Sequence, residues 1–293
     1  MPPPRTARRY LQCDVFADRP GAGNPLGVVF DAGDMDAAAM QALAAWLNLS
    51  ETIFFLPPDT GADYRIRIFT PASELPFAGH PSVGAAWVAV AHRLALPRGG
   101  RLVQQCGAGL LPVEVSGEGD GFHVAVRSPR ARLVEELAVP LPAGLDAIAA
   151  PDRLAALCSN GPPWWLVEAA SPTQVRGFAP DFAAIAAWTN ATRATGVAIF
   201  AFEHGGGHDL VVRAFCPGDA VNVPEDPVTG SANALIAALL HRQGRLPGRD
   251  GRYVASQGRE LGRDGRVHVQ VDDEGEVWIG GEVQQVIDGR LDW

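Results

Sequence analysis

The chain has 293 residues, of which 47% are hydrophobic and 19% are charged, and its net charge is −9. This composition is typical of a globular protein and excludes a disordered or fibrous one. A pI near 5.2 argues against a nucleic-acid partner, because phosphate binding requires clustered Lys and Arg. The sequence contains no stretch of about 18 apolar residues that could cross a membrane. We therefore expect neither nucleic acid nor a membrane among its partners.

We expect the protein to be cytoplasmic. Residues 1–5 lead almost at once into a predicted strand, without the apolar segment and small-residue cleavage site of a signal peptide. The cysteines have neither metal-binding nor disulfide spacing, which suits a reducing compartment. They are Cys13, Cys106, Cys158 and Cys216. We expect them to act as small buried hydrophobic residues.

In chain order, the first predicted elements are two strands, at 11–16 and 27–30, separated by a turn rich in Gly, Pro and Asn. The turn, at 21–25, superficially resembles a dinucleotide-binding loop. Its glycine spacing is wrong for that loop, and it leads into a strand where a helix is required. The sequence therefore argues against a Rossmann-type nucleotide site.

A helix is predicted over 36–48, where apolar residues recur at positions i, i+3, i+4 and i+7. Glu51 follows it, at the threshold of a strongly apolar strand that ends at Leu56. A solvated glutamate at the end of a strand is the simpler interpretation. Burial against Ile53 or Phe54 would instead raise its pKa toward neutrality, as a general base requires. The residues alone leave both interpretations open.

The next strand, at 64–69, leads into a segment that returns in variant form about half a chain later. Residues 67–71 and 213–217 share the pattern Arg-x-Phe-x-Pro. Residues 74–79 and 225–230 then share the pattern Glu-x-Pro-x-x-Gly. Chance rarely aligns both motifs, so the sequence predicts two similar structural units.

Each repeated glycine precedes a run of small and apolar residues without a polar face, at 81–91 and 232–240. A helix that is apolar all round must be covered on every side. We therefore predict two units, each a curled sheet around one buried helix. Because helix N-termini offer free N–H groups and the positive end of the dipole, Gly79 and Gly230 are predicted to mark a site for an anionic substrate.

The remaining segments are predicted mainly as strands. They lie at 101–107, 110–115 and 122–126 in the first half, and at 164–167, 196–202, 209–215, 253–258, 267–271 and 277–280 in the second, which also has a helix at 181–190. Residues 130–161 are rich in Pro and Ala and are predicted to contain a linker and the entry to a domain, with 140–144 as the weakest point. We expect domains at 1–128 and 129–293, with the last residues packing back on the first domain. The second half has Gly196 where the first has Glu51, so the carboxylate is not duplicated.

One pair of histidines invites a metal-site hypothesis. His204 and His208 flank a run of three glycines. Histidines on such a hairpin without a cysteine or carboxylate ligand are usually exposed to solvent, and we predict no metal site there.

Five groups of residues together resemble the phenazine-biosynthesis PhzF-like isomerase family. They are 14–16 with 23–25, 48–55, 69–80, 225–232 and 256–263. The resemblance extends from Asp14 to Gly289. It implies an α+β protein with the diaminopimelate epimerase-like fold: two pseudo-symmetric domains, each a curled mixed sheet around a central buried helix, with the active site in the cleft between them.

The resemblance further implies a cofactor-independent isomerase in which a single glutamate moves a proton on a small carboxylated substrate that bears amino or hydroxyl groups. Carried over by position, the catalytic residues are Glu51, His80 and Asp226. The residues expected to bind the substrate are Asn24, Gly79, Gly230 and Ser231. We expect no cofactor and no metal, and we expect a homodimer.

Two other functions are consistent with the same residues. Ser231, His80 and Asp226 are the residue types of a hydrolase triad, although the Gly-x-Ser-x-Gly elbow is missing. A ligand-binding protein that keeps the cleft but has lost the chemistry is the third possibility. Related epimerases that use two cysteines are disfavoured, because neither Gly79-His-Pro nor Gly230-Ser-Ala contains one.

Overall fold

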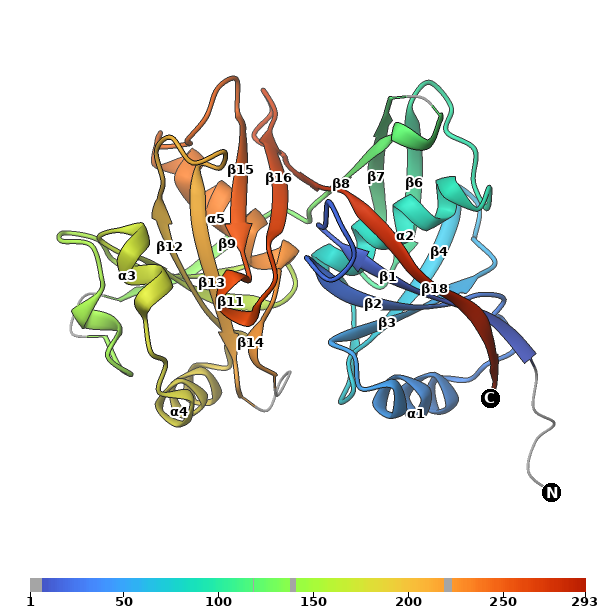
Figure 1. Cartoon of the computed structure of the whole chain (residues 1–293), viewed down its shortest axis with the longest axis horizontal. Helices are drawn as coiled ribbons and strands as arrows, with labels where there is room; N and C mark the ends of the chain where they lie inside the picture. Colours follow the sequence, from blue (N-terminus) through green and yellow to red (C-terminus); the bar gives the residue numbers. More distant parts are fainter. Residues whose placement is uncertain (1–6, 118, 138–140, 219–222) are drawn as a thin grey trace.

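The computed structural model describes residues 7–117, 119–137, 141–218 and 223–293. Figure 1 shows two lobes side by side, each with strands curled around one central helix. The predicted α+β fold, with two similar units around two buried helices, is confirmed.

The first lobe contains most of the elements of the first half of the chain. They are β1 (Ala7–Val15), β2 (Asn24–Val29), α1 (Ala37–Leu47), β3 (Glu51–Leu56), β4 (Tyr64–Phe69), β5 (Glu74–Leu75), α2 (Gly79–Ala91), β6 (Arg101–Cys106), β7 (Gly109–Ser116), the 3-10 turn η1 (Gly119–Gly121) and β8 (His123–Arg127). The Asp36 side chain caps α1 by accepting the Ala39 N–H at 2.8 Å. Asn48 ends α1 in the left-handed conformation, with φ 53°.

The second lobe repeats this order. Its elements are β9 (Arg132–Leu137), η2 (Leu145–Ala147), β10 (Ala155–Ser159), β11 (Pro163–Glu168), α3 (Pro172–Gly177), α4 (Phe182–Thr192), β12 (Gly196–Phe202), β13 (Leu210–Cys216), β14 (Val223–Asp226), α5 (Gly230–Arg242), β15 (Arg252–Gln257), η3 (Arg259–Leu261), β16 (Gly265–Val271) and β17 (Val277–Gly280). The last strand of the chain, β18 (Val283–Asp292), lies in the first lobe. Like α1, α4 is capped by an aspartate, Asp181, and is followed by a left-handed residue, Arg193.

The strand pairings show the same symmetry. In the first lobe, β2 runs parallel to β3 and β4 runs parallel to β6. In the second lobe, β11 runs parallel to β12 and β13 runs parallel to β15. The buried helix lies between β5 and β6 in one lobe and between β14 and β15 in the other, and it begins at the repeated glycine in both.

The last strand of each half of the chain pairs with a strand of the other lobe. After β8, the chain crosses to the second lobe, where β9 pairs with β10. After β17, it returns to the first lobe, where β18 pairs with β1 from Val15–Val283 to Ala7–Asp292. Figure 1 shows β18 lying along β1. The pairing of β8 with β17 joins the two lobes where these exchanges begin.

The segment 130–161, predicted to contain a linker and a domain entry, is where the chain enters the second lobe. It contains β9 and β10, which pair with each other, and β10 is buried along its whole length. The predicted weakest point at 140–144 begins outside the described residues, and Leu145 beyond it is fully buried. Composition alone missed these strands because Glu, in β9, and Ala, in β10, are poor strand formers, whereas pairing on both sides of β10 supplies the stability.

The repeated Arg and Glu of the two motifs form the same ion pair in both lobes. Arg67 makes two hydrogen bonds to Glu74, at 2.7 and 2.6 Å. Arg213 makes two to Glu225, at 2.8 and 2.9 Å, and this pair is buried. Because each bridge ties a long strand to the segment that precedes the buried helix, the repeated motif has a structural role.

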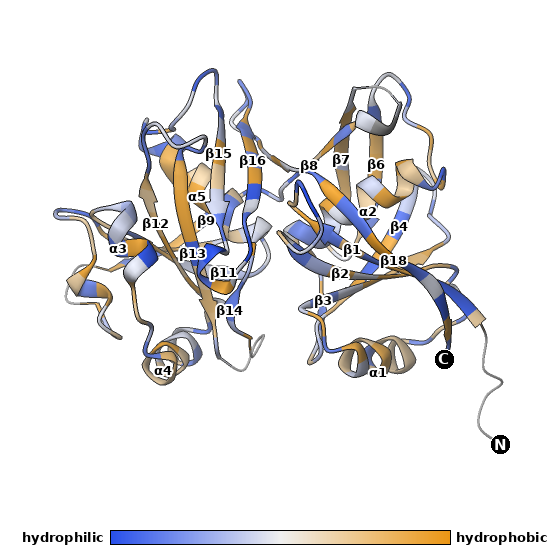
Figure 2. Cartoon of the chain, in the orientation of Figure 1, coloured by the Kyte–Doolittle hydropathy of each residue, from blue (hydrophilic) through white to orange (hydrophobic). Residues whose placement is uncertain are grey.

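The two central helices are covered on every side, as their composition predicts. Ten of the thirteen residues of α2 are buried, as are ten of the thirteen of α5. Small residues allow this: a Cβ on Gly84 would lie 2.4 Å from the Leu26 side chain of β2. Figure 2 shows the matching hydrophobic runs in β12 and β13 of the second lobe.

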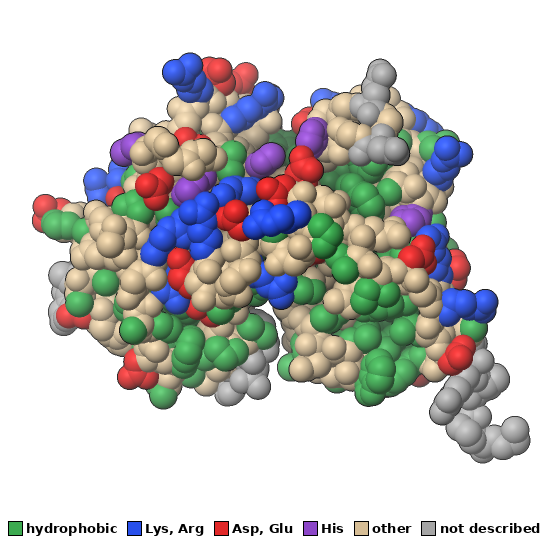
Figure 3. Space-filling model, in the orientation of Figure 1, with side chains coloured by type: hydrophobic (Ala, Val, Ile, Leu, Met, Phe, Trp, Pro, Cys, Tyr) green, Lys and Arg blue, Asp and Glu red, His purple; other side chains and the backbone are tan. Residues whose placement is uncertain are grey.

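Charged side chains gather where the lobes meet, at the centre of the face in Figure 3. Asp264 of the second lobe lies 2.8 Å from both Arg259 and Arg266, and 3.8 Å from Arg19 of the first lobe. The Asp264 N–H also donates to the Ala22 carbonyl.

The helices can also be compared with the length of a membrane span. Among the helices of the described residues, none has the length and apolar character required to span a bilayer.

Candidate active site

The starts of the two buried helices touch each other. A Cβ built on Gly79 would lie 2.6 Å from the Gly230 Cα and 2.7 Å from the Ser231 backbone nitrogen. A Cβ built on Gly230 would lie 2.8 Å from the Gly79 Cα and 2.9 Å from the His80 nitrogen. Only glycine fits at either position. Two sets of free helix N–H groups therefore meet at one point between the lobes.

Asn24 connects the two lobes beside these helix starts. Its fully buried side-chain amide donates to the Asp226 carboxylate at 2.7 Å and to the Val228 carbonyl at 2.9 Å. Its carbonyl oxygen accepts from the Ser50 hydroxyl at 3.0 Å. Asn24, at the start of β2, thus holds the carboxylate of Asp226, at the end of β14, in position.

Glu51 lies at the start of β3 with its side chain only 13% exposed. Its Oε2 is buried, without a hydrogen-bond partner among the described residues, and lies 3.5 Å from His80 Nδ1. Loss of hydration and, to a smaller extent, the charge of Asp226 together raise the pKa of Glu51 to about 8, against a hydrogen bond from Ser50 that lowers it. The solvated strand-end interpretation of this glutamate is therefore wrong.

The other two titratable groups are also shifted by burial. Desolvation raises the pKa of Asp226 to about 6, against the hydrogen bonds from Thr229 and Asn24. The Thr229 bond is short, at 2.6 Å. Desolvation lowers the pKa of His80 to about 3, so its imidazole is neutral near pH 7.

These groups surround a cavity of about 60 Å³. Glu51, Asp226 and Ser231 line it, together with three residues that the sequence did not single out, Trp164, Thr195 and Cys216. Gly79, His80, Gly230 and Asn24 lie just behind this lining: Gly79 contacts the Ser231 backbone, Gly230 precedes Ser231, His80 lies beside Glu51, and Asn24 donates to Asp226. The structure therefore brings all seven predicted site residues together.

The three missed residues had only weak signals in the sequence. Cys216 occupies one of the two variable positions of the second Arg-x-Phe-x-Pro motif, a pattern that predicts a strand residue and gives no sign that it lines a cavity. Burial and the nearby carboxylates raise the pKa of its thiol well above the usual value. Trp164 begins a buried strand, where a tryptophan predicts core packing.

The phenazine biosynthesis-like family profile matches residues 13–289. The trans-2,3-dihydro-3-hydroxyanthranilate isomerase of Pseudomonas aeruginosa is 33% identical over 82% of this chain and 82% of its own length. The chain belongs to the phenazine biosynthesis-like family. The Pseudomonas relative and others in Mesorhizobium japonicum and Deinococcus radiodurans are named isomerases, and the chain is an isomerase of this family.

Solved structures show the same fold. The PhzF-family protein of Bacillus anthracis superposes with a TM-score of 0.81 at 21% identity, covering 98% of this chain and 99% of that one. A probable proline racemase from Agrobacterium radiobacter superposes with a TM-score of 0.66 at 14% identity, covering 97% and 92%. The phenazine biosynthesis-like family therefore shares its two-lobed architecture with racemases.

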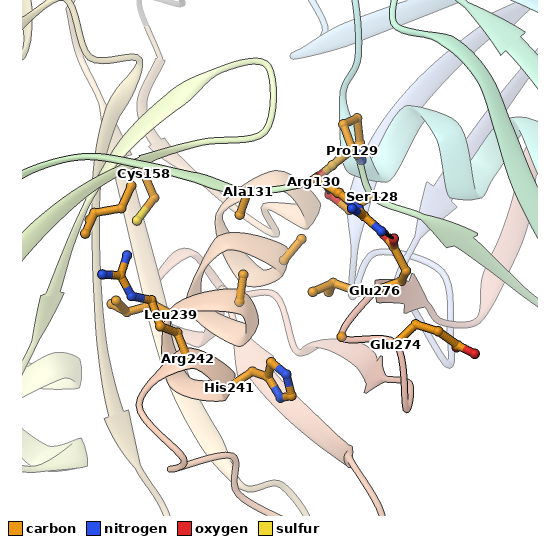
Figure 4. Close-up of a pocket in the computed structure, with 15 residues that line it drawn as sticks. Ser128, Pro129, Arg130, Ala131, Cys158, Leu239, His241, Arg242, Glu274 and Glu276 are labelled. Atoms are coloured by element: carbon orange, nitrogen blue, oxygen red, sulfur yellow. Dashed lines mark hydrogen bonds and ion pairs between the residues drawn. The ribbon is translucent and has the colours of Figure 1, made fainter.

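A larger hollow, of about 370 Å³, lies elsewhere in this family member. Arg130, His241, Arg242 and Glu276 line it, with apolar side chains from α5 (Figure 4). Its lining residues on α5 run from Ala234 to Arg242, about 6 to 18 Å along the helix from Gly230. It does not include Glu51 or Asp226, and we do not assign the chemistry to it.

The glycine hairpin at 204–208 differs from the prediction in one respect. His208 is buried and lies 3.8 Å from Glu203, whereas His204 is exposed. The prediction that both histidines are exposed is therefore wrong for His208. Among the described residues, no group of three His, Cys, Asp or Glu side chains is arranged to hold a metal ion.

Proposed function

We propose that the protein is a cofactor-independent isomerase that moves a proton between two carbons of a small carboxylated substrate bearing amino or hydroxyl groups, with Glu51 as the single acid and base. One observation carries the proposal: Glu51 is a buried carboxyl group, with a pKa raised to about 8, facing a cavity between the lobes. Such a group is populated in both forms near neutral pH, so it can take a proton and return it.

The asymmetry of the two lobes supports a proton shift on one face of the substrate. A racemase that inverts a carbon usually places an acid and a base on opposite faces. Here the second lobe has Gly196 at the start of β12, where the first lobe has Glu51 at the start of β3. A single residue that serves both steps requires the proton to leave and return on the same face.

The other groups have roles in binding and charge stabilisation. The free N–H groups at Gly79 and Gly230, with the Ser231 hydroxyl, are suited to hold the substrate carboxylate. Asp226, fixed by Asn24 and Thr229, can accept a hydrogen bond from an amino or hydroxyl group of the substrate. Neutral His80 beside Glu51 can stabilise charge as it develops by hydrogen bonding.

The geometry gives little support to a hydrolase. A Ser-His-Asp triad requires the histidine to hydrogen-bond both partners. The polar neighbours of the His80 side chain include Asn24, Glu51 and the backbone of Pro25, and among the described residues it has no hydrogen bond to Ser231 or Asp226. A two-thiol racemase is disfavoured as well, because Cys216 alone among the described cysteines lines the cavity.

Exchange of substrate protons with deuterated solvent tests the proposal directly. The first substrate to offer is trans-2,3-dihydro-3-hydroxyanthranilate, on which the Pseudomonas relative is named to act, followed by a panel of small amino and hydroxy acids. We expect NMR to show deuterium entering a carbon-bound position of at least one of them. Binding without any exchange across the panel would favour the non-catalytic alternative, and ester cleavage would favour the hydrolase.

A further inference from the structure

One residue that lines the cavity carries a buried hydrogen-bond donor for which the proposed chemistry has no use. Trp164 is 3% exposed and lines the cavity. Its indole Nε1 is buried and has no hydrogen-bond partner among the described residues. Buried donors without an acceptor are uncommon, because each costs about 1–3 kcal/mol. The neighbouring residue shows the usual arrangement: the Trp165 indole donates to the Thr192 hydroxyl at 3.0 Å.

The symmetry of the lobes explains why the indole lies there. In the first lobe, Leu26 of β2 pairs with Glu51 of β3. In the second lobe, Trp164 of β11 pairs with Gly196 of β12 in the same parallel arrangement. A Cβ on Gly196 would lie 2.6 Å from Cζ3 of the indole. The glycine that replaces the carboxylate therefore makes room for a bulky ring carrying an N–H group.

We propose that the Trp164 indole N–H binds an oxygen of the substrate other than its carboxylate, so that the substrate class is a carboxylic acid with a second hydrogen-bond acceptor, a hydroxyl or carbonyl oxygen. The inference rests on the proposed function. The carboxylate is assigned to the helix starts, where N–H groups from both lobes meet. Trp164 instead lies beside Thr195 and Cys216, where the other end of the substrate extends. An indole N–H only donates, so it selects an acceptor and rejects an ammonium group.

A pair of stable aromatic probes isolates this contact. 3-Hydroxyanthranilate carries the carboxylate, the amine and a hydroxyl group, whereas anthranilate lacks the hydroxyl. We expect Trp164→Phe, which keeps an aromatic ring but removes the N–H, to raise the Kd for 3-hydroxyanthranilate roughly 10-fold and the Kd for anthranilate less than about 2-fold. Trp164→His, which retains an N–H donor, should restore part of the difference. Trp165→Phe is the matched control and should leave both Kd values unchanged.

The indole N–H signals of the ¹⁵N-labelled parent protein give a second measurement. The effect of the ligand is read on the parent protein itself, and the variants serve only to assign the Trp164 signal. The Nε1–H resonance of Trp164, identified by its loss in Trp164→Phe or Trp164→His, should move downfield with 3-hydroxyanthranilate and much less with anthranilate. Equal losses of affinity for both probes, or an unmoved Trp164 signal when 3-hydroxyanthranilate binds, would overturn the inference. If neither probe binds the parent protein, the substrate class of the proposed function is wrong and this inference falls with it. A moved Trp164 signal in a protein that exchanges no substrate protons would uphold the contact and contradict the proposed chemistry.

Discussion

Glu51 and Asp226 are two carboxyl groups whose neighbouring residues separate their properties. Asp226 receives short hydrogen bonds from Asn24 and Thr229, which favour its ionised form. Oε2 of Glu51 has no such partner. The same loss of hydration therefore leaves Asp226 with a pKa of about 6 and Glu51 with one of about 8. Near pH 7, the pair can hold one charge and one proton at the same time.

Replacing Glu51 with glutamine tests its role in proton transfer. The amide keeps the shape of the side chain and removes the titratable group. We expect proton exchange, measured by deuterium incorporation into the substrate, to fall by about 10²-fold or more, whereas Kd changes little. Ser231→Ala should do the reverse and weaken binding first. Should Glu51→Gln exchange protons as fast as the parent, His80 or Asp226 must be the base.

The pH dependence of kcat/KM should report the coupling between the two carboxyl groups. Glu51 becomes a base as the pH rises through its pKa of about 8, so kcat/KM should rise over that range. The negative charge of Asp226 disfavours ionisation of Glu51. Asp226→Asn removes that charge, lowers the pKa of Glu51 and shifts the rise to lower pH.

Replacing Ser50 should shift the pKa of Glu51 in the opposite direction and so serves as a control for Asp226→Asn. Its hydrogen bond lowers the pKa of Glu51, so Ser50→Ala should move the rise in kcat/KM to higher pH. Profiles from pH 5 to 10 for the parent and both variants distinguish the two directions. Identical midpoints in all three proteins would mean that the profile belongs to another group.

At the scale of elements, the sequence predicted the helix starts well and the surrounding contacts poorly. The doubled Glu-x-Pro-x-x-Gly pattern located both buried helices. Glycine is required at both helix starts because their backbones touch and leave no space for a side chain. The ion pairs of Arg67 and Arg213 could not be assigned from the motif, since the spacing between Arg and Glu differs in the two halves. The sequence also could not predict that Trp164 and Cys216 line the cavity, because their position beside Glu51 depends on how the two lobes pack together.

The contact between the helix starts predicts the effect of adding one methyl group there. A Cβ on Gly79 would lie within 3.0 Å of backbone atoms of Gly230 and Ser231, which cannot move aside as a side chain can. We expect Gly79→Ala to destabilise the fold by about 1–3 kcal/mol and to abolish ligand binding. Thermal unfolding and calorimetric titration measure the two effects.

Gly177→Ala is the matched control for this substitution. Gly177 ends α3, and a Cβ there would have no atom within 4 Å. We expect the control to leave both the unfolding temperature and ligand binding near the parent values. Normal binding by Gly79→Ala would show that the helix starts do not form the anion site.

At the scale of the whole molecule, the exchanged strands bear on where the domains divide. The proposed boundary between 128 and 129 falls between β8 and β9, and so assigns β9 to the lobe in which it pairs. It also separates β18 from its partner β1, which residues 1–128 contain. The boundary and the expected homodimer stay predictions, because both concern how the pieces behave in solution.

A fragment of residues 7–128 should therefore not reach the native state alone. Without β18, β1 loses a ladder that spans Ala7 to Val15 and the ion pair between Arg9 and Asp288. We expect a synthetic peptide of residues 282–293 to bind the fragment and to protect the amides of β1 from hydrogen exchange. A peptide of the same composition in scrambled order is the control. A fragment that shows native protection unaided would contradict this dependence.

The exchange also sets an order in time. As the ribosome makes the chain, the second lobe can use its borrowed strand early, because β9 is translated before the rest of that lobe. The first lobe must wait, because β18 is synthesised after every other strand named here, and until then β1 has an unpaired edge. The lobe that carries Glu51 is thus the last to close. A messenger interrupted between codons 227 and 282 yields a chain with both carboxylates but without the strand that completes the first lobe.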